Sequence, residues 1–561
     1  MTADTLKKAI KEAVLSLSLD VDEIHLEHPT NLSNGDYSTN TAMIIAKKAG
    51  RNPKELAGEI VRYIERNKPE LVEKVEVAGA GFINFYLSKE FFAENLNEII
   101  KAKDKWGGSD SLKKQKTIVE YTDPNPFKEF HIGHLMSNSI GESISRIVEF
   151  SGAEVKRANY QGDVGLHVAK AIWGLQQGRS LLEAYAYGAK NYEGNEDEIK
   201  EINKKIYEKS DEKLNSLYEE GRKSSLEHFE EIYKKLGTKF DEYFFESESS
   251  PVGKKLVEEN TGKIFEESDG AVIFKGEKYG LHTRVFLNSD KLPTYEAKDL
   301  ALAKIKNKRY DYDKSIVVTA NEQKEYYKVV LEAMKQIFPE LREMTKHITH
   351  GMMRLPSGKM SSRTGDVITT ESLIDEVKER VVEKMKDSDI ASPRLVGLGP
   401  KDKAQIAEEI AVGAIKYSIL KQSAGKDIIF DMDKSLSFEG DSGPYLQYAH
   451  TRALSVLEKA KQEKINPRIN PKDIPREKIT ELEKLLYRFP EIVERANKEY
   501  EPHYIVTYLT DLAGAFNSFY AKEKIVEESE TAGYKVALTE SFANTIRNGL
   551  WLLGIKAPER M

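Results

Sequence analysis

Apolar and polar positions follow different patterns in successive parts of the chain, and each pattern predicts a kind of structure. A helical pattern starts at the N-terminus, and a second, alanine-rich one covers about 40–66. "EVAGAGFINFYL" (76–87) alternates between apolar and polar residues as a β-strand does. We therefore predict a small α+β domain over residues 1–105, with a basic linker over 101–116.

A strand, a helix and a second strand come next. The run from Thr117 to Tyr121 predicts a buried strand that two prolines end, and helical spacing extends from about Gly133 to Ser151. "AEVKRANYQGDVG" (153–165) supplies the second strand. This order is typical of a βαβ unit, so it predicts a parallel sheet.

The middle and the end of the chain differ in pattern. Residues 180–240 are rich in lysine and glutamate at helical spacing, which predicts a helical insertion. "SIVVTA" (315–320) is a short β-branched run of the kind found in central parallel strands. The last part is helical in pattern throughout. We predict a Rossmann-like α/β domain over 106–390 and an all-α domain over 391–561.

Composition narrows the class of protein. The 561 residues are 40% hydrophobic and 32% charged, which fits a soluble globular protein, and no apolar run approaches the roughly 20 residues of a bilayer span. There is no cysteine, which excludes disulfides and thiolate zinc sites and fits the cytoplasm. The net charge of −7 argues mildly against a polyanionic partner, but local basic surface decides that question.

"FHIGHL" (130–135) contains the first candidate chemistry. His131 and His134 would share a face if a helix begins here, and a metal site is one interpretation. A zinc site would want a third ligand, and none stands at a recognisable spacing. A junction of parallel strand and helix favours phosphate instead. A pair of ordinary surface histidines is the third interpretation.

"LPSGKMSSRTGD" (355–366) is the second candidate. Gly358 and Gly365 enclose a polar segment with one lysine, Lys359. A mobile loop that closes over a triphosphate needs such a point charge. Taken alone, a Gly-Lys-Ser segment is more often a plain turn.

Together the two segments resemble the paired "HIGH" and "KMSKS" signatures of class I aminoacyl-tRNA synthetases, except that Ser362 stands where the second lysine is usual. The resemblance extends over nearly the whole chain to the arginyl-tRNA synthetase family, through "DPNPFKEFHIGHL", "GAGFINFYL" and "GPYLQYAHTRA". It implies a catalytic domain over 106–390, an N-terminal domain that binds the tRNA elbow and a C-terminal domain that binds the anticodon.

The chemistry of the arginine side chain predicts which groups its binding pocket should contain. A guanidinium is planar, charged and forked, so a selective pocket should offer carboxylates and hydrogen-bond acceptors and no cation. "TYEAKD" puts Tyr295 and Asp299 on one face of a predicted helix. The resemblance implies arginine contacts at Asn125, His134, Glu246, Tyr295, Asp299 and Gln323.

The resemblance also implies catalysis by positioning and charge neutralisation. His131, His134 and Lys359 would act on the phosphates of ATP as cations or hydrogen-bond donors, with Mg²⁺ on the β and γ oxygens and no protein-bound zinc. Gly133 would let adenine approach the backbone. The implied ATP contacts are His131, Gly133, His134, Lys359, Met360 and Ser361. The implied tRNA contacts are Phe82, Asn84, Tyr445, Tyr448 and Met561.

We therefore predict a cytoplasmic, monomeric enzyme that binds no membrane, activates L-arginine with ATP and joins it to the terminal adenosine of tRNA(Arg). A synthetase for another amino acid is the nearest rival. Pockets for glutamine and glutamate must meet an amide or a carboxylate, and Glu246 and Asp299 would repel an acidic substrate. A nucleotidylyltransferase without RNA would not require the long helical domain. A synthetase-like RNA-binding or regulatory protein with an inactive site would not need His131, His134 and Lys359.

Overall fold

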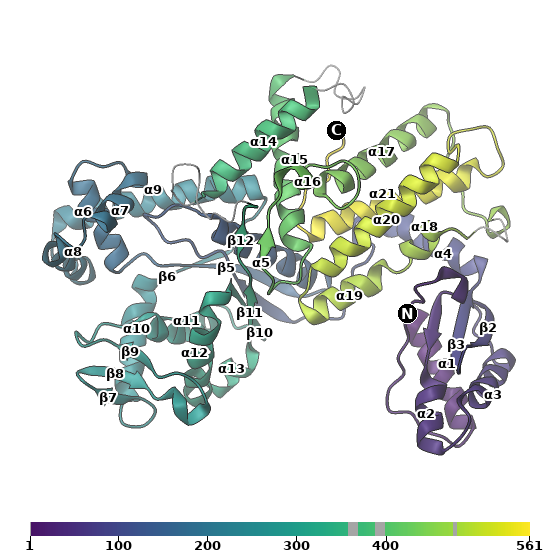
Figure 1. Ribbon diagram of the computed structural model, residues 1–561, viewed down its shortest axis with the longest axis horizontal. Helices are drawn as coiled ribbons and strands as arrows, with labels where there is room; N and C mark the ends of the chain where they lie inside the picture. Colours follow the sequence, from purple (N-terminus) through teal and green to yellow (C-terminus); the bar gives the residue numbers. More distant parts are fainter. Residues whose placement is uncertain (1, 357–367, 387–398, 475–478) are drawn as a thin grey trace. The chain divides into compact units, whose positions relative to one another are not determined.

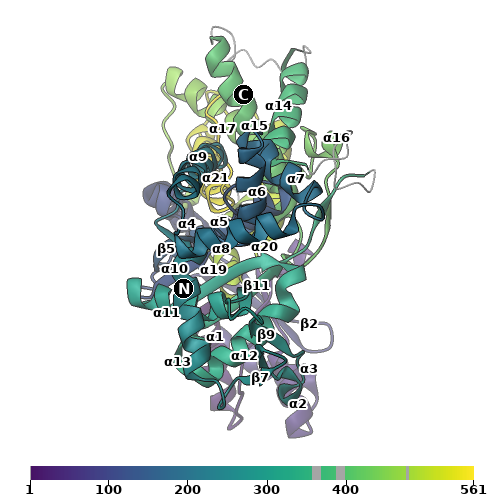
Figure 2. The ribbon, with the colours of Figure 1, turned by 90° about the vertical axis from the view of Figure 1, so that its left-hand side faces the viewer.

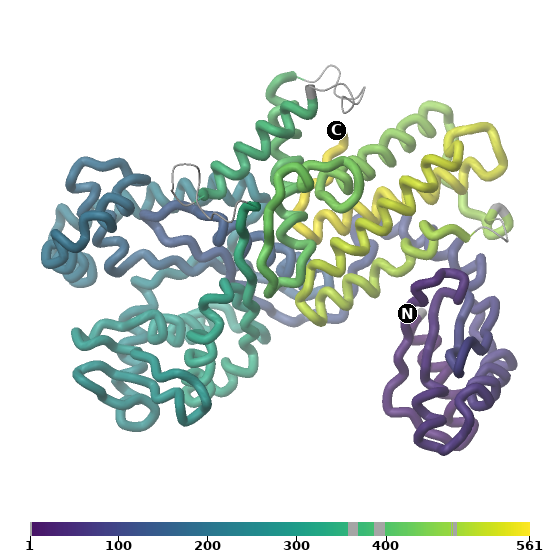
Figure 3. Tube along the Cα trace, viewed as in Figure 1, coloured from purple at the N-terminus to yellow at the C-terminus, as the bar shows by residue number. Residues whose placement is uncertain are grey.

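The computed structural model describes residues 2–356, 368–386, 399–474 and 479–561 (Figure 1). These residues form two compact units, and Figure 3 traces the chain through them. The first unit comprises Met1–Trp106, Arg452–Phe489 and Asp511–Ile546, and the second comprises Gly107–Thr451, Pro490–Thr510 and Arg547–Met561. Because each unit combines distant stretches of sequence, both contain contacts that local patterns do not reveal.

The first unit begins with an antiparallel sheet of order β1-β3-β2 and its helices. The strand predicted over 76–87 is a hairpin, because Gly79 and Gly81 adopt positive φ and reverse the chain. The helical segment predicted near 40–66 is two helices, since Asn52 caps the second and Pro53 starts it. The elements are α1 Thr2–Ser16, β1 Tyr37–Thr39, α2 Thr41–Ala49, α3 Pro53–Arg66, β2 Val72–Ala78, β3 Phe82–Leu87 and α4 Lys89–Ala102.

The second unit contains the predicted parallel sheet. Its strands are β4 Lys116–Glu120, β5 Glu154–Gln161, β6 Glu242–Phe245, β10 Lys314–Ala320 and β11 Thr345–His350, in the order β11-β10-β4-β5-β6. All neighbouring pairs are parallel, and α5 (Ile132–Phe150) connects β4 to β5. The Rossmann-like prediction is confirmed. The outer strands β6 and β11 were not predicted, because one is only four residues long and the other is polar.

The predicted insertion is helical, and Figure 2 shows it facing the viewer. Its helices are α6 Leu166–Gln176, α7 Leu181–Lys190, α8 Glu196–Glu208 and α9 Glu212–Leu236. α6 and α7 pack backbone to backbone, since a Cβ on Gly188 would lie 2.0 Å from the carbonyl oxygen of Lys170. Asp163, which follows β5, pairs with Arg222 of α9 at 3.1 Å and so fixes the insertion to the sheet.

The second unit also contains an antiparallel sheet, which the sequence did not predict. Along the chain, its strands come after the insertion and before β10. Its strands are β7 Glu266–Ser268, β8 Ala271–Phe274 and β9 Arg284–Leu287, each too short to show a clear alternation. The helices around it are α10 Glu246–Glu259, α11 Tyr295–Arg309, α12 Lys324–Ile337 and α13 Pro339–Met344. α10 lies close against α11, because a Cβ on Gly253 would be 2.4 Å from the carbonyl oxygen of Ala297.

The last part of the chain is helical, as predicted, apart from Ile428–Ile429 (β13), which pairs with Met353–Arg354 (β12). Its helices are α14 Thr370–Lys386, α15 Pro400–Leu420, α16 Met432–Ser435, α17 Gly443–Gln462, α18 Glu481–Leu486, α19 Phe489–Glu499, α20 His503–Lys522 and α21 Ala532–Leu552. In the second unit, the buried Lys416 donates to the carbonyl oxygens of Leu236 (2.7 Å) and Gly554 (2.9 Å). Within the described ranges, no helix is both long and apolar enough to span a bilayer.

Candidate active site

The carboxyl ends of the five parallel strands form one edge of the sheet, and several expected site residues follow them. Asn125 lies beyond β4, Glu246 directly follows β6, and Gln323 lies just beyond β10. The order of strands reverses between β4 and β10, which is where open α/β sheets bind ligands. The topology therefore brings to one edge residues that are far apart in the sequence.

The two histidines cap the start of α5. His131 is the N-cap residue, and its Nδ1 accepts a hydrogen bond from the backbone N–H of Gly133 at 3.1 Å. Nδ1 of His134 accepts from the backbone N–H of His131 at 3.2 Å, and the two rings stack with centroids 3.8 Å apart. Because Nδ1 is the acceptor in both neutral rings, the proton is on Nε2. Each ring keeps an Nε2–H with which it can donate to a ligand.

Burial makes both imidazoles neutral. It lowers the pKa of His131, and the charge of Lys128 lowers it further. Burial also lowers the pKa of His134 well below its usual range, with smaller contributions from His131 and Lys128. Of the two roles expected toward phosphate, cation and hydrogen-bond donor, neutral imidazoles support only the second. A donor to phosphate oxygens next to a helix N-terminus still stabilises negative charge.

Gly133 lies directly under the ring of His131. A Cβ on Gly133 would be 2.9 Å from Cε1 and 3.0 Å from Nδ1 of that ring. Real Cβ atoms do not approach so closely, so the glycine allows His131 to cap the helix. Its contact with adenine stays a prediction.

The segment after the lysine loop lies beside the histidines. Lys359, Met360, Ser361 and Ser362 are outside the described residues, so their predicted roles stay predictions. The backbone N–H of Ile132 donates to the carbonyl oxygen of Ile368 at 3.2 Å, and that of Thr370 donates to Phe130 at 2.8 Å. Ile368 and Thr370 therefore lie next to "FHIGHL", although they are far from it in the sequence.

The pocket expected for the arginine side chain contains a cation. Glu246 is 4% exposed, and its Oε2 lies 2.6 Å from Nζ of Lys298 on α11. Burial raises the pKa of Glu246, and the ammonium of Lys298 acts in the opposite direction. The expectation that this pocket offers no cation is wrong. "TYEAKD" contains this lysine beside Asp299, but only the packing of α10 on α11 brings it to Glu246.

The other expected arginine contacts lie on α11 and before α12. Asp299 accepts a hydrogen bond from the hydroxyl of Tyr326, and burial raises its pKa to about 8. Tyr295 is one turn earlier on the same helix, as predicted, and is 57% exposed. Gln323 is exposed and lies three residues before Tyr326. Asp299 and Glu246 are close enough to affect each other's ionisation.

The polar turn after β5 contributes residues that the sequence did not single out. The backbone N–H of Gly162 donates to Oδ1 of Asn125 at 3.0 Å. A Cβ on Gly162 would lie 2.5 Å from that oxygen and 3.1 Å from Oε1 of Glu246, so the glycine lets both side chains converge. Nε2 of His167 contacts the carbonyl oxygen of Gly162 at 2.8 Å. "NYQGDVG" contained the signal, a glycine directly after a parallel strand.

The residues expected to touch tRNA differ in exposure. Phe82 in β3 and both Tyr445 and Tyr448 on α17 are half-buried. Asn84 is 3% exposed and accepts a hydrogen bond from the hydroxyl of Ser38, and Met561 is 2% exposed. Asn84 and Met561 are therefore buried, and their contact with tRNA stays a prediction.

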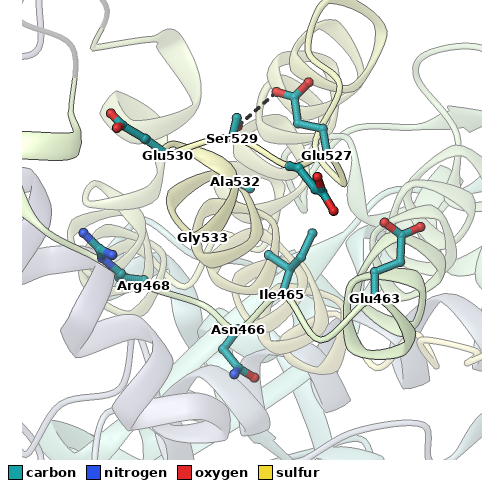
Figure 4. A pocket seen from close by; sticks show the side chains of 10 residues that line it. Glu463, Ile465, Asn466, Arg468, Glu527, Ser529, Glu530, Ala532 and Gly533 are labelled. Atoms are coloured by element: carbon teal, nitrogen blue, oxygen red, sulfur yellow. Dashed lines mark hydrogen bonds between the residues drawn. The ribbon is translucent and has the colours of Figure 1, made fainter.

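A cavity of about 540 Å³ lies in the first unit, where Glu463, Glu527 and Glu530 line it together with Arg468 (Figure 4). None of its lining residues belongs to the parallel sheet or to the loops that follow its strands. Its acidic lining makes it a poor site for an anion such as ATP. Among the residues that the structure describes, no three His, Asp or Glu side chains gather closely enough to hold a metal ion.

Comparison with known protein families agrees with this architecture. Residues 95–432 match "tRNA synthetases class I (R), catalytic domain", 446–561 match "DALR anticodon binding domain", and 3–87 match "Arginyl tRNA synthetase N terminal domain". The fold and the site therefore define a class I aminoacyl-tRNA synthetase. The match of the catalytic family alone covers more than half of the chain. The chain belongs to the arginyl-tRNA synthetase family.

Individual proteins support this assignment. The arginine–tRNA ligase of Clostridium perfringens is 31% identical over 99% of this chain and 100% of its own length. The arginine–tRNA ligase of Fusobacterium nucleatum is 32% identical over 97% of this chain and 96% of its own length. The solved arginyl-tRNA synthetase of Thermus thermophilus covers all of both chains with 25% identity and a TM-score of 0.80. The Plasmodium falciparum structure, at 22% identity and a TM-score of 0.81, supports the fold.

Proposed function

We propose that this chain activates L-arginine with ATP, which gives arginyl-adenylate and pyrophosphate, and then transfers arginine to the 3′-terminal adenosine of tRNA(Arg). The observation that carries this proposal is the pairing of two sites at one sheet edge. One is a helix start with two imidazole donors, and the other has the buried carboxylates of Glu246 and Asp299. The first suits the phosphates of ATP, and the second suits a guanidinium.

Activation proceeds by positioning. The arginine carboxylate attacks the α-phosphorus in line, pyrophosphate leaves, and no side chain has to transfer a proton. His131 and His134 donate through Nε2 to phosphate oxygens, and Lys359, Met360 and Ser361 contribute further contacts to ATP. ATP enters with Mg²⁺ on its β and γ oxygens, and no protein-bound zinc takes part.

Arginine is held from both of its ends. Glu246 and Asp299 bind the guanidinium, with Tyr295 and Gln323 at its edge. Asn125 and His134 hold the α-amino and carboxylate groups. Asn125 is already oriented by Gly162, which reduces the entropy lost on binding.

The tRNA contacts lie in both the N-terminal and the helical regions. Phe82 offers an aromatic face toward the elbow, and Tyr445 and Tyr448 offer faces toward the anticodon bases. Asn84 and Met561 are further proposed tRNA contacts, and both are buried. We further propose that the enzyme acts as a monomer in the cytoplasm.

ATP–pyrophosphate exchange tests the proposal against its rivals. Exchange should require arginine and should increase markedly when tRNA(Arg) is added. Exchange with glutamate or another amino acid would favour a different synthetase, and exchange with a small molecule and no RNA dependence would favour a nucleotidylyltransferase. No exchange with arginine plus tRNA would indicate an RNA-binding or regulatory protein and would refute the proposal.

A further inference from the structure

Lys298 is a buried charge within the proposed arginine pocket, and the proposed mechanism does not use it. Its ammonium lies 2.6 Å from Oε2 of Glu246, and each of the two side chains is 6% exposed. The same ammonium lies 5.3 Å from the ring centroid of Tyr295. Both Glu246 and Tyr295 are expected arginine contacts, so a lysine of the chain itself occupies the place where the substrate's cation should bind.

Neither charge is stable in this place without the other. Burial alone would favour the neutral form of both side chains. The carboxylate of Glu246 nevertheless raises the pKa of Lys298 against the effect of burial. Removal of one partner would leave an uncompensated buried charge, which is strongly destabilising unless the group changes its protonation.

We propose that Lys298 is the resident cation of the arginine pocket. It neutralises Glu246 while the pocket is empty, and the guanidinium of arginine displaces it from that carboxylate. This inference rests on the proposed function and makes Lys298 a specificity-determining residue.

The geometry favours displacement. Lys298 engages one oxygen of Glu246, whereas a guanidinium can engage both with its parallel N–H groups. The second oxygen, Oε1, faces the backbone of Gly162, whose lack of a side chain lets Glu246 and Asn125 converge there. The flexible stem of Lys298 allows the ammonium to move toward the exposed ring of Tyr295, which can hold it by a cation–π contact.

Selectivity follows from this exchange. A substrate with a single ammonium offers Glu246 nothing that Lys298 does not already supply. A neutral urea, as in citrulline, cannot replace the cation at an ionised carboxylate. Only a forked cation makes a stronger interaction with Glu246 than the resident lysine does.

Three variants test the proposal by exchange kinetics with saturating tRNA. Lys298→Arg places a guanidinium on Glu246, so the KM for arginine should rise about tenfold or more while the KM for ATP changes less than about twofold. Lys298→Met removes the cation that competes with arginine for Glu246. Lys306→Met is the matched control, because Lys306 is on the same helix and forms an equally buried pair with Glu120 at 2.7 Å. It should leave the KM for arginine unchanged.

Proton release on arginine binding provides a readout that does not depend on catalysis. In Lys298→Met, the empty pocket should hold Glu246 protonated, so arginine binding should release about one proton more than in the wild type, where only Asp299, with its raised pKa, has a carboxyl proton to release. The other ionisable groups that face Glu246 are Asp299, Asp163, Lys128, Tyr160, Tyr207 and Tyr295. Calorimetry in two buffers of different ionisation enthalpy measures the difference, and citrulline should compete better with arginine in this variant.

The outcomes separate this inference from the proposed function. If Lys298→Arg keeps the wild-type KM for arginine, the pair is a permanent structural ion pair, and the inference fails while the function stands. Equal effects of Lys298→Met and Lys306→Met on arginine binding would lead to the same conclusion. A wild-type protein that binds no arginine would refute both.

Discussion

The two ends of the candidate active site hold their polar side chains by opposite means. At the start of α5, backbone N–H groups orient two imidazoles, and burial keeps both neutral. Between α10 and α11, Lys298 accompanies the buried Glu246 and opposes its protonation. A site for an anion can use neutral donors and a helix N-terminus. A site for a cation needs an ionised carboxylate. When that carboxylate is buried, another cation has to neutralise it until the substrate binds.

The largest effect should come from removing the charge at the cation end. Glu246→Gln leaves Lys298 buried without its partner and facing the incoming guanidinium, so the KM for arginine should rise about 100-fold or more. The KM for ATP should change little. The matched control is Glu248→Gln, two residues further along α10, where the carboxylate pairs with Arg309 at the surface. If both variants behave alike, or if the KM for ATP rises equally, the proposed division of the site is wrong.

The second effect concerns the neutral end. His131→Ser keeps a good N-cap but removes the Nε2–H donor, so kcat should fall about 100-fold, as when an oxyanion donor is lost. Thermal unfolding of the variant should match the wild type, which would show that the cap survives.

The pH profile tests the charge of the same residue. Because burial lowers the pKa of His131, its charged form appears only on the acid side of its usual range. The kcat/KM for ATP should therefore show no histidine titration between about pH 7 and 8.5. A fall in activity through this range that His131→Ser abolishes would indicate a cationic imidazole instead.

The smallest effect concerns a buried lysine that donates to backbone carbonyl oxygens. Lys416 donates to those of Leu236 and Gly554, and burial lowers its pKa to about 7 although the charge of Glu142 acts in the opposite direction. The unfolded chain keeps the proton up to about pH 10, so it binds more protons than the folded chain between these values. Stability should therefore rise with pH in this window, by at most about 1.4 kcal/mol per unit.

Lys416→Met should reduce this slope, and urea unfolding at about pH 7, 8 and 9 would measure it. Lys403→Met, on the exposed side of the same helix, should keep the slope of the wild type. An unchanged slope in Lys416→Met would mean that this lysine is charged in the folded protein. A buried lysine would then stay charged without a paired carboxylate, and the charge of Lys298 would not require Glu246.

The sequence allowed much of the fold to be predicted, because local signals were strong. The apolar run before "DPNPF" predicted β4, the helical spacing after His131 predicted α5, and the "SIVVTA" run predicted β10. The hairpin at Gly79–Gly81 and the short strands β6 to β9 were missed, because a few residues carry too little periodicity. Similarly, Tyr295 and Asp299 could be placed on one helix face, but the partner of Asp299 could not be foreseen.

By itself, the sequence determined the two motifs, the residue types of the pocket and the family resemblance, since these depend on identity and spacing. Tertiary structure alone decided which charges meet. The crossover of the parallel sheet brings Glu246 beside Gly162 and Asn125, and the close packing of α10 on α11 puts Lys298 on Glu246. It also decided that both histidines are neutral, because burial and the neighbouring Lys128 set their ionisation. Spacing along a chain contains no information about such solvation.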